Sequence, residues 1–204
     1  MIPTSLSLTY PSASANGIAT TQTPGGAGAL TITAKTFTNP TYVTVTSGGS
    51  SEAGKNFTIT GTMANGQAGS ETIAGPGVSA TVTTTRAFLT VTAITIDAAT
   101  TGAVTAGWAQ SGNSKPCPMD QYQSPFNVGM GVVVSGTINY TVQHTFDNVF
   151  DSTVTVTWFS HPVLAALTAN QDGNYAFPVK AIRLKINSGS GVAALTILQA
   201  GTTG

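Results

Sequence analysis

The feature that most constrains this chain is a repeated alternation of apolar residues with threonine over short segments. Leu30–Thr33, Tyr42–Thr46 and Phe57–Thr60 follow this pattern, and Val78–Thr83 and Val91–Ile96 continue it. A period of two places Val, Ile and Phe on one face and Thr on the other, as in a half-buried antiparallel strand. Threonine is β-branched, so it favours an extended backbone while staying polar on the outer face.

Turn signals separate these segments at short intervals. Asn65-Gly66 lies between Phe57–Met63 and Glu71–Ile73 and predicts a β-hairpin. Further turn signals are Ser47–Ser50, Gly75–Gly77 and Thr101–Gly102.

The second half of the chain repeats this style without repeating the sequence. The expected strands are Val128–Val134, Thr137–Phe146, Thr153–Phe159, Val179–Ile186 and Val192–Gln199. Asp172-Gly173 and the Gly-Ser-Gly at 189–191 are expected turns. Evidence for helix is limited to Pro162–Ala169, which could form one or two turns.

The chain is therefore predicted to be all-β, with two β-sandwich-like (Ig-like or jelly-roll-like) antiparallel domains, because regularly spaced short strands are typical of sandwiches and barrels. Its first residues are mostly Ser, Ala, Thr, Gly and Pro and predict an extended arm, which could also drape over a neighbouring subunit. The expected divisions are an N-terminal arm at 1–28, a domain at 29–108, a Pro-rich linker at 109–118 and a second domain at 119–204.

Charge is unusually sparse in this chain. Asp, Glu, Lys and Arg make up 7 % of the 204 residues, against about 25 % in an average soluble protein, and seven basic residues balance seven acidic ones. A surface near zero net charge has little repulsion to keep copies apart, which favours assembly with other subunits. The basic residues form no cluster, which argues against binding to nucleic acid.

Neither a secretory signal nor a membrane span is predicted. Met1–Ser5 lacks a basic region followed by an apolar core, and no segment approaches about 18 uninterrupted apolar residues. The single cysteine, Cys117, excludes an intrachain disulfide and lies in Lys115–Pro118, where prolines disfavour regular structure. We interpret it as a loop thiol, since a catalytic thiol would need a partner of the histidine type.

The best local group for chemistry is His144, Asp147 and Asp151, at the end of an expected strand and in the next loop. An imidazole and carboxylates could hold a metal ion, but this spacing matches no strong metal motif and differs from an EF-hand loop. We favour solvated turn carboxylates and an ordinary histidine, and we predict no catalytic residue, no metal site and no cofactor. The other carboxylates considered are Glu52, Glu71, Asp97 and Asp120, in turn-like, edge or linker contexts.

The remaining candidates are cationic and aromatic side chains. His161, which follows Trp158-Phe159, is expected to be a loop histidine that packs beside aromatic side chains. Arg183 and Lys185 alternate with apolar residues and are expected on the outward face of their strand, as interface contacts. Trp108 and the other aromatic residues are expected in the core, although a sugar-binding face would use exposed aromatics.

Two sets of segments resemble known proteins. The first is NFTITGTMANG at 56–66, followed by ETIAGP at 71–76, RAFLTVTAI at 86–94 and TGAVTAG at 101–107. It resembles a β module of tailed-bacteriophage structural proteins, with Met63 in place of the usual Asp and Ala106 in place of Val. The second set resembles the companion domain of those proteins, and together they span about residues 40–201. It consists of GTINYTVQHTFD at 136–147, WFSHP at 158–162, PVKAIRL at 178–184 and LTILQAG at 195–201.

This resemblance implies a non-enzymatic virion component, assembled in the host cytoplasm, with no catalytic residues to carry over. The expected function is a capsid decoration (cement) protein. It would bind the major capsid protein or other virion subunits as a homo-oligomer, with a trimer expected. One alternative is a tail or head–tail connector component, which differs in copy number per particle. Another is a carbohydrate-binding adhesion module with a solvent-facing Trp or Tyr cluster. An enzyme would need His144, Asp147 and a third group to converge in a pocket.

Overall fold

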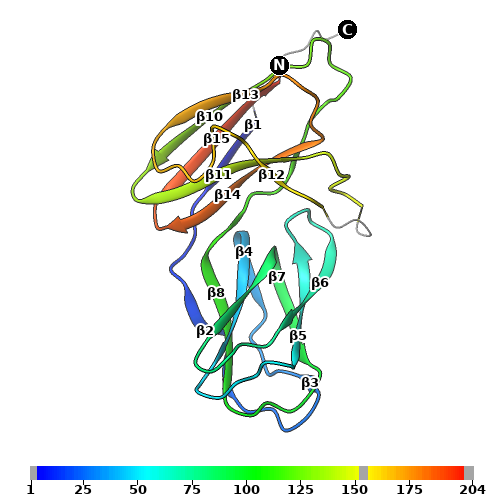
Figure 1. Ribbon diagram of the computed structural model, residues 1–204, viewed down its shortest axis with the longest axis vertical. Helices are drawn as coiled ribbons and strands as arrows, with labels where there is room; N and C mark the ends of the chain where they lie inside the picture. Colours follow the sequence, from blue (N-terminus) through cyan, green and yellow to red (C-terminus); the bar gives the residue numbers. More distant parts are fainter. Residues whose placement is uncertain (1–3, 152–155, 200–204) are drawn as a thin grey trace. The chain divides into compact units, whose positions relative to one another are not determined.

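Strands are the only regular elements in the computed structural model, which describes residues 4–151 and 156–199. The strand pairs are antiparallel, so the predicted all-β antiparallel class is confirmed. The chain divides into two units (Figure 1). Unit 1 comprises Met1–Pro11 and Ser111–Gly204, and unit 2 comprises Ser12–Gln110.

Unit 1 contains strands from two sheets. One sheet has the order β1–β15–β10–β13, and the other brings together β12, β11 and β14, with β9 and the last residues of β8 also paired to β14 (Figure 1). The strands are β1 (Thr4–Leu8), β8 (Val104–Asn113), β9 (Cys117–Pro118), β10 (Val128–Ser135), β11 (Ile138–Thr145), β12 (Phe159–Ser160), β13 (Gln171–Tyr175), β14 (Ala181–Gly189) and β15 (Val192–Gln199).

Both sheets of unit 1 contribute side chains to one hydrophobic core. In β10, Val128, Met130 and Val132 point inward and are at most 4 % exposed, whereas Val133 on the opposite face is 61 % exposed. Burying one such side chain contributes about 1.5–3 kcal/mol relative to leaving it in water. The alternation in the sequence therefore decides which face of the strand is buried.

An irregular segment lies along β11 on the side opposite β14, next to the short strand β12. The expected helical turns at Pro162–Ala169 are wrong, because these residues form bends whose backbone bonds to β11 instead. Tyr140 and Leu167 exchange two backbone hydrogen bonds of 2.9 Å, and Val142 N–H donates to the Leu164 carbonyl at 2.8 Å. The segment thus pairs its backbone N–H and C=O groups with those of β11, whereas in a helical turn they would have bonded within the segment itself.

Unit 2 is built around one long strand, β7. It pairs with β4, β5 and β3, while β6 pairs with β5, and β8 lies beside β4 and β2. The strands are β2 (Ser14–Gln22), β3 (Gly28–Ala29), β4 (Lys35–Ser47), β5 (Asn56–Met63), β6 (Ala68–Ala74) and β7 (Thr81–Ile96). The predicted hairpin is confirmed between β5 and β6, where Gly66 has a φ of +84°, a conformation that glycine adopts without strain.

The N-terminal residues do not stand apart as an arm. β1 pairs with β15 from Thr4↔Ile197 to Leu8↔Ala193, and β2 pairs with β8. The unit boundaries therefore fall after Pro11 and Gln110, and the expected linker at 109–118 contains the end of β8 and all of β9. The small polar residues of this segment show little alternation of apolar and polar side chains. Pairing with strands distant in the sequence therefore decides where they lie.

Several expected local elements also differ from the structure. Leu30–Thr33 forms no strand, although the Leu30 N–H still donates to the Ile94 carbonyl at 2.8 Å. Val78–Thr83 becomes a strand only from Thr81. Asp172-Gly173, expected as a turn, lies within β13. Of the expected strand Thr153–Phe159, residues 153–155 lie outside the described residues, and Phe159 begins β12.

Candidate functional site

His144, Asp147 and Asp151, the group considered for chemistry, do not come together as a site. Asp147 Oδ2 accepts the backbone N–H of Thr157 at 2.6 Å, whereas His144 Nδ1 faces the Tyr175 hydroxyl at 2.8 Å. In the described part of the chain, no three His, Cys, Asp or Glu side chains are placed to hold a metal ion. These residues therefore hold local structure together instead of forming a cation cage.

The other carboxylates considered all accept hydrogen bonds from neighbouring groups. Two hydrogen bonds from Asn56 lower the pKa of Asp97, and the Gln123 amide lowers the pKa of Asp120. The remaining donors are Thr85 and Arg86 to Glu71, and Lys55, Thr101 and Gly102 to Glu52. Carboxylates in this role close turns and loops.

Cys117 is not a loop thiol, because it lies in β9 and pairs with Ile182 of β14. Its side chain is buried, and this burial raises the pKa of the thiol. Arg183 lies on the face of β14 that points away from the core, as expected, and is engaged within its own unit. Its guanidinium stacks on the Trp158 ring at 4.0 Å and donates two hydrogen bonds to Gln143 Oε1 at 2.9 and 2.7 Å.

Lys185 is half-buried, and burial followed by repulsion from Arg183 lowers its ammonium pKa. Trp108 is also half-buried, with the Lys35 ammonium 4.4 Å from its ring centroid. Each tryptophan thus carries a cation on its face within the described residues. The exposed Trp or Tyr cluster expected of an aromatic sugar-binding module is not present among them.

Three phenylalanines instead form an exposed patch in unit 1, here called the aromatic patch: Phe146, Phe159 and Phe177. Phe146 follows β11, Phe159 begins β12 and Phe177 follows β13. Their side chains are 53, 47 and 49 % exposed, and the Phe146 ring centroid lies 5.9 Å from that of Phe159 and 6.4 Å from that of Phe177. Large apolar groups gathered on a surface mark interaction sites.

A buried polar pair supports this patch from below. The His144 ring stacks on Phe159 with centroids 5.7 Å apart and also contacts Phe146 and Phe177 edge-on. Burial lowers the pKa of His144 and strongly raises that of Tyr175, so both groups are neutral, and the phenol hydroxyl and His144 Nδ1 share a hydrogen bond of 2.8 Å. This arrangement fixes the imidazole ring on which the three phenyl rings rest.

His161 is buried against the other side of Tyr175, with ring centroids 4.9 Å apart. Its Nδ1 accepts the backbone N–H groups of Val163 and Leu164 at 3.1 Å, so Nε2 carries the proton and donates to the Asn174 carbonyl at 3.2 Å. All its polar capacity is used within the protein. The predicted packing of His161 beside an aromatic ring is thus confirmed, with Tyr175 as the neighbour.

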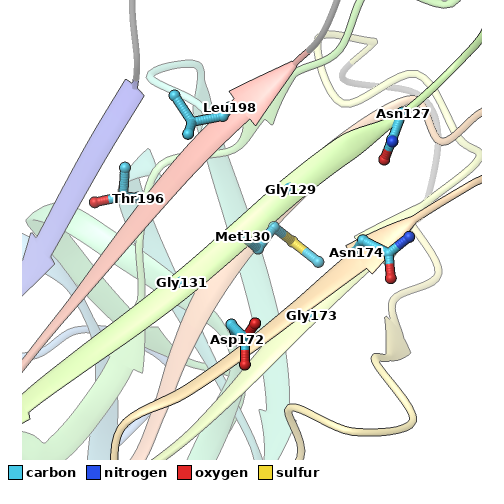
Figure 2. Close-up of a pocket in the computed structure, with 9 residues that line it drawn as sticks. All are labelled: Asn127, Gly129, Met130, Gly131, Asp172, Gly173, Asn174, Thr196 and Leu198. Atoms are coloured by element: carbon cyan, nitrogen blue, oxygen red, sulfur yellow. The ribbon is translucent and has the colours of Figure 1, made fainter.

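A second surface feature is a shallow groove of about 560 Å³ over β10, β13 and β15. Figure 2 shows Gly129 and Gly131 on the middle strand, with Asp172 and Asn174 on one flank. The opposite flank carries Thr196 and Leu198, and Asn127 lies at one end. The lining combines a carboxylate, two amides and a hydroxyl with a floor that has no side chains.

Sequence reasoning missed both surfaces. The three phenylalanines are up to 31 positions apart, and only the pairing of β11 with β12 and the loop after β13 bring them together. A local signal did exist for the groove, since Gly129 and Gly131 alternate within an otherwise apolar strand. Glycine inside a strand commonly marks a close approach by a ligand or another backbone.

No family model, curated protein or solved structure matches this chain. Among the described residues, the model contains no helix of sufficient length and apolar character to cross a membrane. The two surface features in unit 1 are therefore the starting points for a functional proposal.

Proposed function

We propose that this chain is a non-enzymatic structural component of a tailed-bacteriophage particle, most simply a capsid decoration protein that binds and stabilises the head shell. The observation that carries the proposal is the aromatic patch. Three neighbouring phenyl rings, each about half exposed, lie on a chain with very few charges. Covering them with a neighbouring subunit removes apolar area from water at about 25 cal/mol per Å².

The hydroxyl-rich surface supports the same proposal. On the outer faces of unit 2, Thr46 and Thr81 share a hydrogen bond of 2.8 Å, as do Thr58 and Thr72. Such a surface is neutral and polar, so it can lie against other subunits with little charge to desolvate. The formal net charge of zero removes the repulsion that would keep copies apart.

The proposal extends to assembly and to the finer fold. We infer that the units are β-sandwich-like in the Ig or jelly-roll sense, because both sheets of unit 1 share one core. The proposed partners are the major capsid protein or other virion subunits. A homo-oligomer, with a trimer as the working hypothesis, is tested by light scattering of the purified chain.

The patch is tested by rebinding of the purified chain to particles that lack it. Phe159→Ser removes the ring that stacks on His144 and should lower the number of bound copies about tenfold, which corresponds to about 1.4 kcal/mol. Phe150→Ser is the matched control, because Phe150 is 53 % exposed and is not one of the three patch rings. Equal rebinding of both variants and the unmodified chain would remove the patch from the proposal.

A further inference from the structure

We propose that the groove over β10, β13 and β15 is a binding site for a neutral saccharide. The inference goes beyond a structural role in a particle and does not depend on it. It rests on the two glycines that form the floor of the groove, on the chemistry of its walls and on its place in the sheet.

Packing among the described residues does not explain the floor glycines. A Cβ on Gly131 would meet no atom within 4 Å, and a Cβ on Gly129 would meet only the Leu198 carbonyl oxygen at 3.9 Å. Neither residue has the positive φ that would require glycine. Glycine inside a strand weakens it, so its presence at two successive outward positions indicates that something approaches this backbone closely.

Gly173 provides the contrast on the neighbouring strand. A Cβ there would lie 2.8 Å from the His161 ring, so this glycine is required by packing. Gly129 and Gly131 lack such a neighbour, and side chains at these positions would fill the groove without disturbing the protein. A ligand that binds in the groove would account for the absence of side chains at these two positions.

The walls of the groove suit a ligand with many hydroxyl groups. Asn127 and Asn174 offer amide donors and acceptors, the Asp172 carboxylate accepts, and the Thr196 hydroxyl does both. Side chains of these kinds match adjacent sugar hydroxyls, which also donate and accept. The Leu198 side chain provides an apolar surface for the C–H face of a sugar ring.

Other ligand classes fit this lining less well. The only charged lining residue is Asp172, which opposes anions such as phosphate. A large apolar ligand would meet little apolar surface, because Met130 is 4 % exposed and only Leu198 offers an exposed apolar side chain. An added peptide strand would need free backbone groups, but β10 is paired on both sides, with β13 and with β15.

The volume of the groove agrees with a small ligand. About 560 Å³ falls within the range of about 300–1,000 Å³ that is usual for small-molecule sites. A groove this open on the face of a sheet would accept one or two units of a longer glycan, with the chain continuing into solvent. Binding to a single sugar should therefore be weak, and oligosaccharides should bind more tightly.

The first test is a titration of the isotope-labelled full chain with glucose, galactose, mannose and N-acetylglucosamine, and with their neutral oligosaccharides, followed by NMR. The backbone amide signals of Gly129, Gly131 and Gly173 should shift and saturate with at least one of these sugars. Shifts confined to residues outside the groove, or no saturable shift with any sugar, would overturn the proposal.

Variants separate binding from folding. Gly131→Val should keep the native spectrum, because its added atoms begin in open space, and should weaken binding of the responding sugar about tenfold or more. Asn174→Ala should also weaken binding, by removing wall groups. Val133→Ala is the control, since Val133 lies outside the lining on the exposed face of the same strand.

One further outcome would identify a different occupant. If Gly131→Val folds normally, leaves sugar shifts unchanged and lowers rebinding to particles, the groove holds a protein surface and the saccharide proposal is wrong. Loss of rebinding by Phe159→Ser alone bears only on the aromatic patch. The two sets of variants therefore distinguish failure of one proposal from failure of the other.

Discussion

Glu52 should be a critical side chain for the stability of unit 2. It is fully buried in the connection between β4 and β5. Its Oε1 accepts the Gly102 N–H at 2.8 Å, and its Oε2 accepts the Thr101 N–H at 2.9 Å and the Lys55 ammonium. Its own N–H donates to the Pro76 carbonyl at 2.8 Å. One residue thus joins three loops.

The expected cost of Glu52→Ala follows from these contacts. Removing one member of a buried ion pair costs about 3–5 kcal/mol, because the partner charge and donors lose their acceptor. The lower value of about 3 kcal/mol applies here, since the Lys55 side chain is 17 % exposed and can be partly solvated. Glu52→Gln keeps the shape but loses the charge, so we expect about 1.5–3 kcal/mol.

The effect should depend on pH in a defined direction. Burial alone raises the pKa of Glu52, but the hydrogen bonds from Lys55, Thr101 and Gly102 outweigh it and hold the pKa below 4.5. The unfolded chain therefore takes up protons first as the pH falls. The stabilisation is complete above the unfolded pKa and is lost as the pH falls through the folded pKa.

The assay is urea denaturation of the unmodified chain and Glu52→Gln at neutral and acidic pH. Fluorescence in a Trp158→Phe background reports on unit 2 through the one remaining tryptophan, Trp108. Asp97→Asn is the control, as it removes the same charge from an exposed site in unit 2. The reasoning is refuted if Glu52→Gln costs no more than the control at neutral pH, or costs as much at acidic pH as at neutral pH.

Four further substitutions or treatments test other parts of the structure. Tyr175→Phe leaves Nδ1 of buried His144 without its hydrogen-bond partner and should cost about 1–3 kcal/mol in denaturant unfolding. Because burial lowers the pKa of His144, the stability of unit 1 should also fall with pH below 6.5, as measured by denaturation across that range. Gly61→Ala would place a Cβ 1.9 Å from the Thr90 carbonyl oxygen and should cost about 3 kcal/mol, measured as a fall in the thermal midpoint. Cys117 should resist a thiol reagent at mildly alkaline pH until the chain is unfolded, because it is buried and its pKa is raised.

The sequence was informative at several places where structure depends on neighbouring residues. The Asn65-Gly66 hairpin and the strand at Val128–Val134 were both predicted, because turn geometry and strand preference are local properties. The sequence also shows that the seven basic residues form no cluster along the chain.

Pairing between distant segments could not be predicted in this way. Thr4–Leu8 was expected to be part of an extended arm, yet it pairs with β15 almost two hundred residues later. Asp172-Gly173 carries a strong turn signal, but β10 offers an edge and the His161 ring occupies the space beside the glycine. In both cases tertiary contacts outweighed local preference.

The candidate surfaces show the same division. Nothing near Phe146 in the sequence indicates that Phe177 will lie beside it, whereas the alternation of Gly129 with Gly131 was visible from the start. That alternation became meaningful only once the strand was seen to turn both glycines to the same outer face.

The most direct measurement for the central proposal is the copy number of this chain in purified phage particles, by quantitative mass spectrometry against the major capsid protein. A capsid decoration protein predicts a ratio close to that of the shell subunits. A count of about a dozen copies would contradict decoration and assign the chain to the tail or connector. Its absence from the particles would contradict a virion role altogether.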